Sequence, residues 1–134
     1  MRILLDTHII IWTLENNPKL PDKARELIVD ESNEIFYSAA SIWEIQIKHM
    51  ARPDKMFIDG ETLSKKCIAS GFEPLPVFER HVHTLASLKR KEGAAPHNDP
   101  FDRILISQAK KDDLVFVTHD ALLPDYREKC ILIV

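Results

Sequence analysis

Residues 97–103 read His-Asn-Asp-Pro-Phe-Asp-Arg, and residues 114–120 read Leu-Val-Phe-Val-Thr-His-Asp. Between these two segments, apolar residues recur at the spacing of one helix face, beginning with Phe101 and Ile104. The run at 114–117 is short and apolar, which is typical of a buried strand. The sequence therefore predicts a helix followed by a strand. Asp99 and Asp102 stand at the start of the helix, and Asp120 follows the strand.

The same alternation of strands and helices runs through the rest of the chain. Apolar runs predict strands at 3–5, 35–37 and 131–134, and an edge strand within 72–77, where Pro74 and Pro76 cannot donate to a ladder on both sides. Helical spacing predicts helices over about 9–16, 21–28, 42–51, 61–69 and 78–88. This order favours an α/β fold with a mainly parallel sheet between two helical layers.

Length and composition exclude several classes of protein. The 134 residues, 45% of them hydrophobic, are expected to form one domain over 1–134. A net charge of −3 does not suit a bulk polyanion binder, and the two cysteines form no CxxC pair that would suggest a thiolate zinc site. The apolar run at the start is too short for a signal peptide or a membrane span, which favours the cytoplasm.

Acidic side chains follow the expected strands at one end. Asp6 follows the first strand, Glu44 is expected in the first turn of the helix after the second strand, and Asp120 follows the fourth. The carboxyl ends of parallel strands share one edge of a sheet, and such folds bind ligands at that edge. Asp99 and Asp102 need only face this edge to join the group.

Each acid also has an ordinary structural explanation. Ser41 and Glu44 have the spacing of a capping box, and Glu44 could pair with Lys48 one turn further on. Asp99 before Pro100 fits a helix N-cap, and the helix dipole favours an acid at position 102. Asp6 and Asp120 could likewise be turn or cap residues. These explanations stay open for each residue taken alone.

A cluster of carboxylates points to a divalent cation, because each charge raises the pKa of its neighbours unless a cation compensates it. Oxygen ligands without cysteine suit Mg²⁺ or Mn²⁺ better than zinc. Mg²⁺ keeps several waters, which leaves positions for a phosphate oxygen and an attacking water. The sequence thus favours metal-assisted hydrolysis of a phosphodiester, with either one ion or two.

Four segments together resemble one family. They are Asp6-Thr7-His8 with Trp12, Ser-Ile-Trp-Glu-Ile at 41–45, the motif at 97–103 and Thr118-His119-Asp120. In this order they resemble the PIN-domain ribonucleases, and most of all the VapC-type toxins of bacterial toxin–antitoxin pairs. Asp-Pro-Phe-Asp-Arg is the most specific part of the likeness.

The resemblance implies an α/β/α sandwich around a parallel five-stranded sheet and a Mg²⁺- or Mn²⁺-dependent endoribonuclease. It also implies a homodimer that a cognate antitoxin protein inhibits. Matched residue by residue, the family's acids fall on Asp6, Glu44, Asp102 and Asp120. Asp99 belongs to a variant of the motif and ranks below these four, as a helix cap, a neighbouring acid or a further metal ligand.

Other residues near the motifs have weaker claims. Thr7 and Thr118 could orient an acid or cap their turns, and capping is slightly favoured. The histidines at 8, 97 and 119 are expected to support the acids or to lie on the surface, and Arg103 could hold an acid or a phosphate or be solvated. Lys89-Arg90-Lys91 fits the cationic end of a helix better than an RNA contact. The tryptophans at 12 and 43 are expected in the core or at a dimer surface.

Three other functions compete with the toxin hypothesis. A phospho-acceptor signalling receiver would need paired acids after the first strand and an acceptor Asp at the third, where this chain has Pro-Leu-Pro. A PIN-fold binding module without turnover would not need the acid set. A housekeeping RNA-processing nuclease would use the same site but would not be toxic. The sequence names neither the RNA, nor the bond cut, nor the partner.

Overall fold

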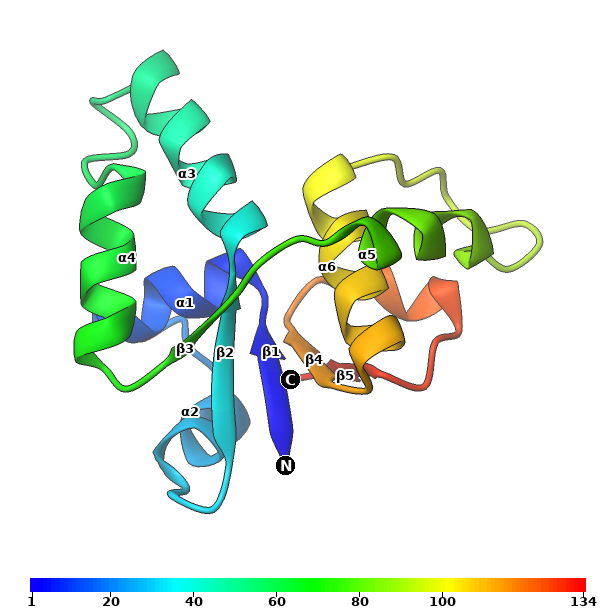
Figure 1. Cartoon of the computed structure of the whole chain (residues 1–134), viewed down its shortest axis with the longest axis horizontal. Helices are drawn as coiled ribbons and strands as arrows, with labels where there is room; N and C mark the ends of the chain where they lie inside the picture. The colour runs from blue at the N-terminus through cyan, green and yellow to red at the C-terminus, as the bar shows by residue number, and fades with distance from the viewer.

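A computed structural model describes residues 1–134 and places all five strands in one parallel sheet of order β3-β2-β1-β4-β5 (Figure 1). The strands are β1 (Arg2–Leu5), β2 (Glu34–Ser38), β3 (Glu73–Leu75), β4 (Val115–Thr118) and β5 (Ile131–Ile133). The edge position expected for the proline-containing strand is confirmed, because β3 pairs only with β2. Each prolyl nitrogen, which has no hydrogen to donate, thus needs no partner on the outer side.

Helices connect the strands and form the outer layers. They are α1 (Thr7–Leu14), α2 (Asp22–Val29), α3 (Ala39–Ala51), α4 (Gly60–Ala69), α5 (Glu79–Thr84) and α6 (Pro100–Asp112), with short 3₁₀ turns η1 (Leu85–Ser87) and η2 (Leu123–Tyr126). Figure 1 shows α1 and α4 on one side of the sheet and α5 and α6 on the other. The three-layer α/β/α architecture is confirmed. None of these helices combines the length and the apolar composition needed to cross a membrane.

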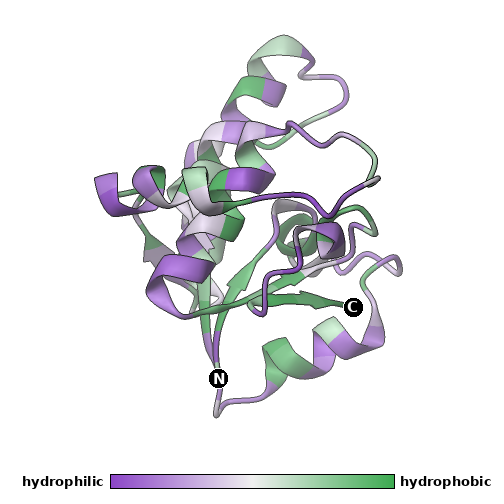
Figure 2. Cartoon of the chain, turned by 90° about the vertical axis from the view of Figure 1, so that its right-hand side faces the viewer, coloured by the Kyte–Doolittle hydropathy of each residue, from purple (hydrophilic) through white to green (hydrophobic).

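Two hydrophobic clusters fill the space between the layers, because successive strand side chains point to opposite faces. Ile3 and Leu5 of β1 pack in one cluster with side chains from α1, α2 and α4. Leu4, between them, packs in the other cluster with Leu105 and Ile106 of α6. In Figure 2 the strands are accordingly coloured as hydrophobic, whereas the surrounding helices alternate. Burial on both faces explains the continuous apolar runs of the strands.

The start of α3 differs from the prediction. The helix begins at Ala39, and its N-cap is Ser38, whose hydroxyl accepts a hydrogen bond from the Ala40 amide at 3.0 Å. Ser41 is therefore inside the helix, and its hydroxyl lies 2.8 Å from that of Thr7. The predicted capping box with Glu44 is wrong because the strand runs directly into the helix. Glu44 lies in the second turn of α3, not in the first.

The basic run Lys89-Arg90-Lys91 also lies elsewhere than expected. The helix α5 ends at Thr84 and η1 at Ser87, so these residues follow in a loop. The Arg90 guanidinium donates to the backbone oxygens of Ala95 and Leu122, and the Lys91 ammonium lies 3.1 Å from a carboxylate oxygen of Asp125. The cationic helix end is thus wrong. Arg90 and Lys91 instead hold this loop against the segment that contains η2.

Candidate metal centre

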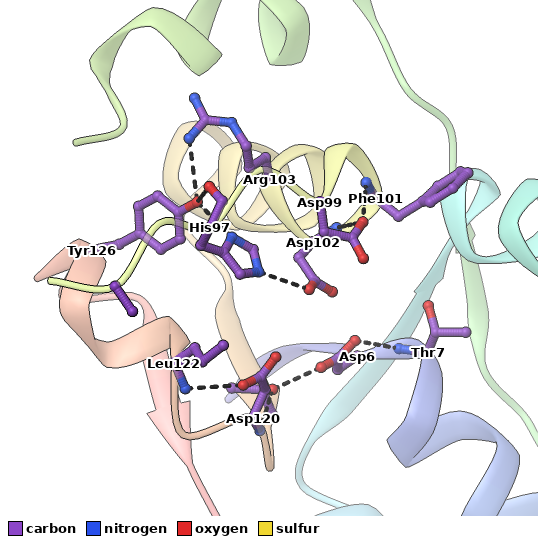
Figure 3. A network of polar contacts seen from close by, with 12 residues as sticks. Asp6, Thr7, His97, Asp99, Phe101, Asp102, Arg103, Asp120, Leu122 and Tyr126 are labelled. Atoms are coloured by element: carbon purple, nitrogen blue, oxygen red, sulfur yellow. Dashed lines mark hydrogen bonds and ion pairs between the residues drawn. The ribbon is translucent and has the colours of Figure 1, made fainter. Parts of the chain in front are cut away.

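Side chains from three elements meet at the carboxyl edge of the sheet. Asp6 is the N-cap of α1, directly after β1, and Asp120 comes two residues after β4. Asp102 lies in the first turn of α6, which runs antiparallel to the strands and so begins at this edge. Figure 3 shows the Asp102 side chain pointing from α6 toward Asp6 and Asp120. The convergence predicted from the strand order is therefore present for these three acids.

Asp6 is held by hydrogen bonds at both carboxylate oxygens. The Thr7 amide donates to Oδ1 at 2.7 Å, and the Thr118 hydroxyl donates to Oδ2 at 2.7 Å. The Thr118 hydroxyl also accepts from the Asp120 amide at 3.1 Å, so it orients an acid and stabilises its own turn. The side chain of Asp6 is 3% exposed, and this burial raises its pKa above the ordinary value despite the hydrogen bonds.

Asp102 faces the other acids of the group from the first turn of α6. Burial first, and then the negative charges of Asp6 and the neighbouring acids, raise its pKa to about 8. Its Oδ2 lies 3.1 Å from Nε2 of His97. One ligand atom each from His97, Asp102 and Asp120 lie within 4.8 Å of one another. These side chains are close enough to share one ion.

Glu44 reaches the same region from α3. Its carboxylate is buried and accepts a hydrogen bond from the Lys48 ammonium at 2.7 Å, so the i, i+4 ion pair considered from the sequence is present. Its negative charge nevertheless contributes to the raised pKa values of both Asp6 and Asp102. Glu44 is therefore part of the electrostatic cluster as well as half of a helix ion pair.

Asp99 has a structural role at the edge of the cluster. It is exposed and caps α6, because its Oδ1 accepts from the amides of Phe101 at 2.8 Å and of Asp102 at 3.3 Å. Its charge also raises the pKa of Asp102. The cap considered from the sequence is present, and the second carboxylate oxygen makes no hydrogen bond within the chain.

The donor set fits a hard divalent cation. Five carboxylates act on one another, and the only cationic side chain paired with any of them is Lys48, apart from His97 if protonated. The two cysteines lie in the hydrophobic clusters, where burial raises their pKa values to about 12 for Cys67 and about 11 for Cys130. Oxygen ligands with at most one imidazole suit Mg²⁺ or Mn²⁺.

A tyrosine that no motif indicated supports His97. The Tyr126 hydroxyl lies 2.7 Å from Nδ1 of His97 and accepts from the Arg103 guanidinium at 3.2 Å. Of the roles that the sequence left open for Arg103, a bond to an acid is absent, because the guanidinium donates to this tyrosine and to the backbone oxygen of Leu85. Tyr126 lies in η2, a single turn whose sequence has no periodic pattern, so only its place in the fold reveals it. His97 is buried between this tyrosine and Asp102, in the supporting position expected for it.

The remaining sequence candidates lie around this centre. Trp12, His8 and His119 line a cavity of about 250 Å³ together with Asp6 and Asp120. Trp43 is 63% exposed and packs edge-on against Phe101. Trp12 is therefore neither a fully buried core residue nor far from the acids.

Comparison with known proteins agrees with this architecture. A profile of the PIN domain matches residues 3–129. Among curated proteins, no sequence matches this chain.

Solved structures of low sequence identity share the fold over nearly the whole chain. In the structure of VapBC2 from Rickettsia felis bound to a promoter DNA fragment, one chain is 18% identical with a TM-score of 0.66, covering 100% of this chain and 98% of that one. In a toxin–antitoxin complex from Klebsiella pneumoniae, one chain is 13% identical with a TM-score of 0.62, and the match covers 97% of this chain and 95% of that one. In the structure of FitAcB from Neisseria gonorrhoeae, one chain is 19% identical with a TM-score of 0.57, and the match covers 90% of this chain and 88% of that one.

Proposed function

Because the chain belongs to the PIN-domain family, we propose that it is a metal-dependent endoribonuclease and the toxin of a toxin–antitoxin pair. The observation that carries the proposal is the cluster around Asp102. Its pKa is raised to about 8 because the buried carboxyl faces the charges of four other acids. Perturbed acids gathered at the edge where α/β folds bind ligands are typical of a functional site.

The proposed ligands are Asp6, Glu44, Asp102 and Asp120, with Asp99 below them. A Mg²⁺ or Mn²⁺ ion bound there would polarise a phosphate oxygen and lower the pKa of a water for attack on the phosphodiester. The chain's own groups keep the acids in place for this. Thr118 and the Thr7 amide fix the Asp6 carboxylate, and His97 fixes that of Asp102.

An antitoxin partner is proposed on two grounds. One of the similar structures is described as a toxin–antitoxin complex. This chain also has an apolar groove of about 440 Å³, whose walls include Val82 and two residues next in the chain to acids, Trp43 before Glu44 and Phe101 before Asp102. An exposed apolar surface of this kind suits a protein partner. We propose that an antitoxin segment lies in this groove, and that a cationic side chain of that segment reaches the carboxylates and blocks the site.

A purified complex tests this docking. The chain is expressed together with the small protein encoded by the adjacent gene, and the two are expected to purify together. Val82→Asp places a charge on the groove and should abolish this co-purification. Retention of the partner by the Val82→Asp protein would contradict the proposed surface.

We further propose a homodimer acting in the cytoplasm, which rests on the family likeness. Light scattering of the purified chain should give twice the mass of one chain. A mass of one chain at all concentrations would contradict the dimer.

The central experiment is an RNA cleavage assay. The wild-type protein should cut RNA with Mg²⁺ or Mn²⁺ and stop when EDTA is added. Asp6→Asn should abolish cleavage, whereas Asp22→Asn, which removes the same charge from the exposed start of α2, should not. Cleavage by the Asp6→Asn protein at the wild-type rate would refute this site. Growth arrest on induction, relieved by the adjacent gene, would distinguish a toxin from a housekeeping nuclease.

A further inference from the structure

The cavity beside the acids has aromatic walls. The Trp12 ring lies close to two histidines, with its centroid 6.0 Å from that of His8 and 5.9 Å from that of His119. The cavity of about 250 Å³ is completed by the carboxyl residues Asp6 and Asp120. Aromatic walls and metal-binding carboxylates thus face one space.

Trp12 has two different surroundings. One part of its side chain packs against the hydrophobic cluster that contains Ile9 and Leu5. The other part borders the cavity, whose remaining lining residues are two exposed histidines and the carboxyl residues Asp6 and Asp120, with no other hydrophobic side chain. A core position alone would not need an indole with one side toward these polar groups. A core position therefore accounts for only part of the surroundings of Trp12.

His119 is fixed as one wall of the cavity. Its Nδ1 is hydrogen-bonded to the backbone oxygen of Val134, next to β5. His8 stands one turn before Trp12 on α1, so the two side chains line the cavity from the same helix face. The planes of Trp12 and His119 are inclined by 69°, and those of Trp12 and His8 by 44°. Neither histidine ring is therefore stacked face to face on the indole.

We propose that this cavity is a stacking site for one nucleobase of single-stranded RNA, with Trp12 as the platform and His8 and His119 as its sides. The inference rests on the proposed nuclease function, because the phosphate of the same nucleotide would lie toward Asp6 and Asp120. Bases of unpaired RNA stack on tryptophan and histidine, and this stacking tolerates different bases. Trp12 thereby fixes where the strand lies relative to the bond that is cut.

Tryptophan fluorescence tests the contact directly, because the chain contains only two tryptophans. In the Trp43→Phe protein, Trp12 is the only tryptophan. Its fluorescence, excited at a wavelength that tyrosine does not absorb, should be quenched when oligo-U, oligo-A or oligo-C is added with Mg²⁺. The matched Trp12→Phe protein retains only Trp43 and should show little quenching. Absence of quenching in the Trp43→Phe protein with all three oligonucleotides would overturn the proposal.

A second pair of variants separates stacking from packing. Trp12→Leu retains apolar contact with the core but has no aromatic face, whereas Trp12→Phe retains both. We expect oligonucleotide affinity to fall by roughly 10- to 100-fold in Trp12→Leu, as for the loss of one stacked base, and to change far less in Trp12→Phe. Equal losses in the two variants, with unchanged melting temperatures, would contradict a stacking role.

Abasic oligonucleotides locate the base. Removing the base at one position near the cleaved bond should weaken binding to the wild-type protein, and the same removal should cost nothing further in Trp12→Leu. If removing the base weakened binding to Trp12→Leu as much as to the wild-type protein, the contact between Trp12 and that base would be contradicted. Cleavage is followed in the same mixtures. Cleavage without Trp12 quenching would refute the stacking site and leave the nuclease, whereas quenching without cleavage would retain the site and refute the nuclease.

Discussion

The two ends of α6 carry aspartates in opposite electrostatic surroundings. Asp102, in the first turn, faces other acids, and its pKa is raised to about 8. Asp112, at the last position, accepts two hydrogen bonds from the Arg80 guanidinium, at 2.9 and 3.0 Å, and lies 2.8 Å from Nε2 of His81. The Arg80 hydrogen bonds, and next those of His81, lower the pKa of Asp112 below its ordinary value.

The difference separates an acid that serves the fold from one that needs an ion. Asp112 has its compensating cation within the chain and links α5 to α6. Burial is the largest cause of the raised pKa of Asp102, and its neighbours add negative charge where Asp112 has a guanidinium. A charge that the fold leaves uncompensated indicates a place for a ligand that compensates it.

Neutralising each of the two aspartates in turn should have its largest effect on RNA cleavage. Asp102→Asn should lower the cleavage rate by at least about 1,000-fold, because several kcal/mol of electrostatic stabilisation by the metal would be lost. Asp112→Asn should cleave at close to the wild-type rate. Single-turnover assays with each variant measure both. Equal losses in the two variants would remove the distinction between the ends of α6.

A smaller effect is expected where the two histidines are compared. His97→Ala removes the support of Asp102 and should weaken metal binding by about 10- to 100-fold, as for other residues that hold a ligand. His81→Ala removes a buried partner of Asp112 and should lower the melting temperature with little effect on metal affinity. Calorimetric metal titrations and thermal melts of both proteins check this. Unchanged metal affinity in His97→Ala would contradict its proposed role.

In EDTA, the two aspartates should change the free energy of unfolding in opposite directions as pH rises. Asp102 has a higher pKa in the folded protein, so the folded state holds an extra proton between about pH 4 and its pKa of about 8, and the unfolding free energy falls as pH rises through this range. Asp112 has a lowered pKa, so its stabilisation is present at neutral pH and is lost in acid.

At pH 8 without metal, Asp102→Asn should therefore be more stable than the wild type, and Asp112→Asn less stable by about 1–3 kcal/mol through its lost charged hydrogen bonds. Urea unfolding curves give both values. Destabilisation by Asp102→Asn in EDTA would show that this carboxyl serves the fold as Asp112 does.

The smallest effect is expected at the ion pair of Glu44, which belongs to the acidic cluster as Asp102 does but has a cationic partner as Asp112 does. Lys48→Met removes the only lysine paired with the cluster and should cost about 0.3–0.5 kcal/mol in stability, as for other i, i+4 pairs. The freed carboxylate should bind metal about twofold more tightly, which corresponds to a similar energy. A large loss of metal affinity would instead assign Lys48 a direct part in the site.

Sequence reasoning predicted the architecture because both clusters leave a signature in the residue pattern. The strands are buried on both faces and so appear as apolar runs, and the prolines at 74 and 76 mark the edge strand. The start of α3 was misplaced because Ser38 and Ser41 both suit an N-cap, and only the three-dimensional contact of Ser41 with Thr7 distinguishes them. The basic run was misplaced because the apolar spacing at 85–88 continues beyond the helical hydrogen bonds.

The site was predicted where it depends on strand ends and motifs. Asp6 and Asp120 could be placed together from the strand order, and Asp102 joined them on the condition that the start of its helix faces the same edge. Tyr126 could not, because its contact with His97 joins two loops that no periodicity relates. The cavity of Trp12 was equally hidden, since the spacing of an amphipathic helix does not show which side of a large aromatic residue meets solvent.

Calorimetric titration of the metal-free protein with Mn²⁺ at several pH values tests whether the carboxylates hold an ion. Because Asp102 must lose its proton to bind the ion, we expect proton release and an affinity that rises about tenfold per pH unit until about pH 8. Asp102→Asn should abolish both the binding and the proton release. No binding by the wild type, or unaltered binding by Asp102→Asn, would contradict an ion held by these carboxylates.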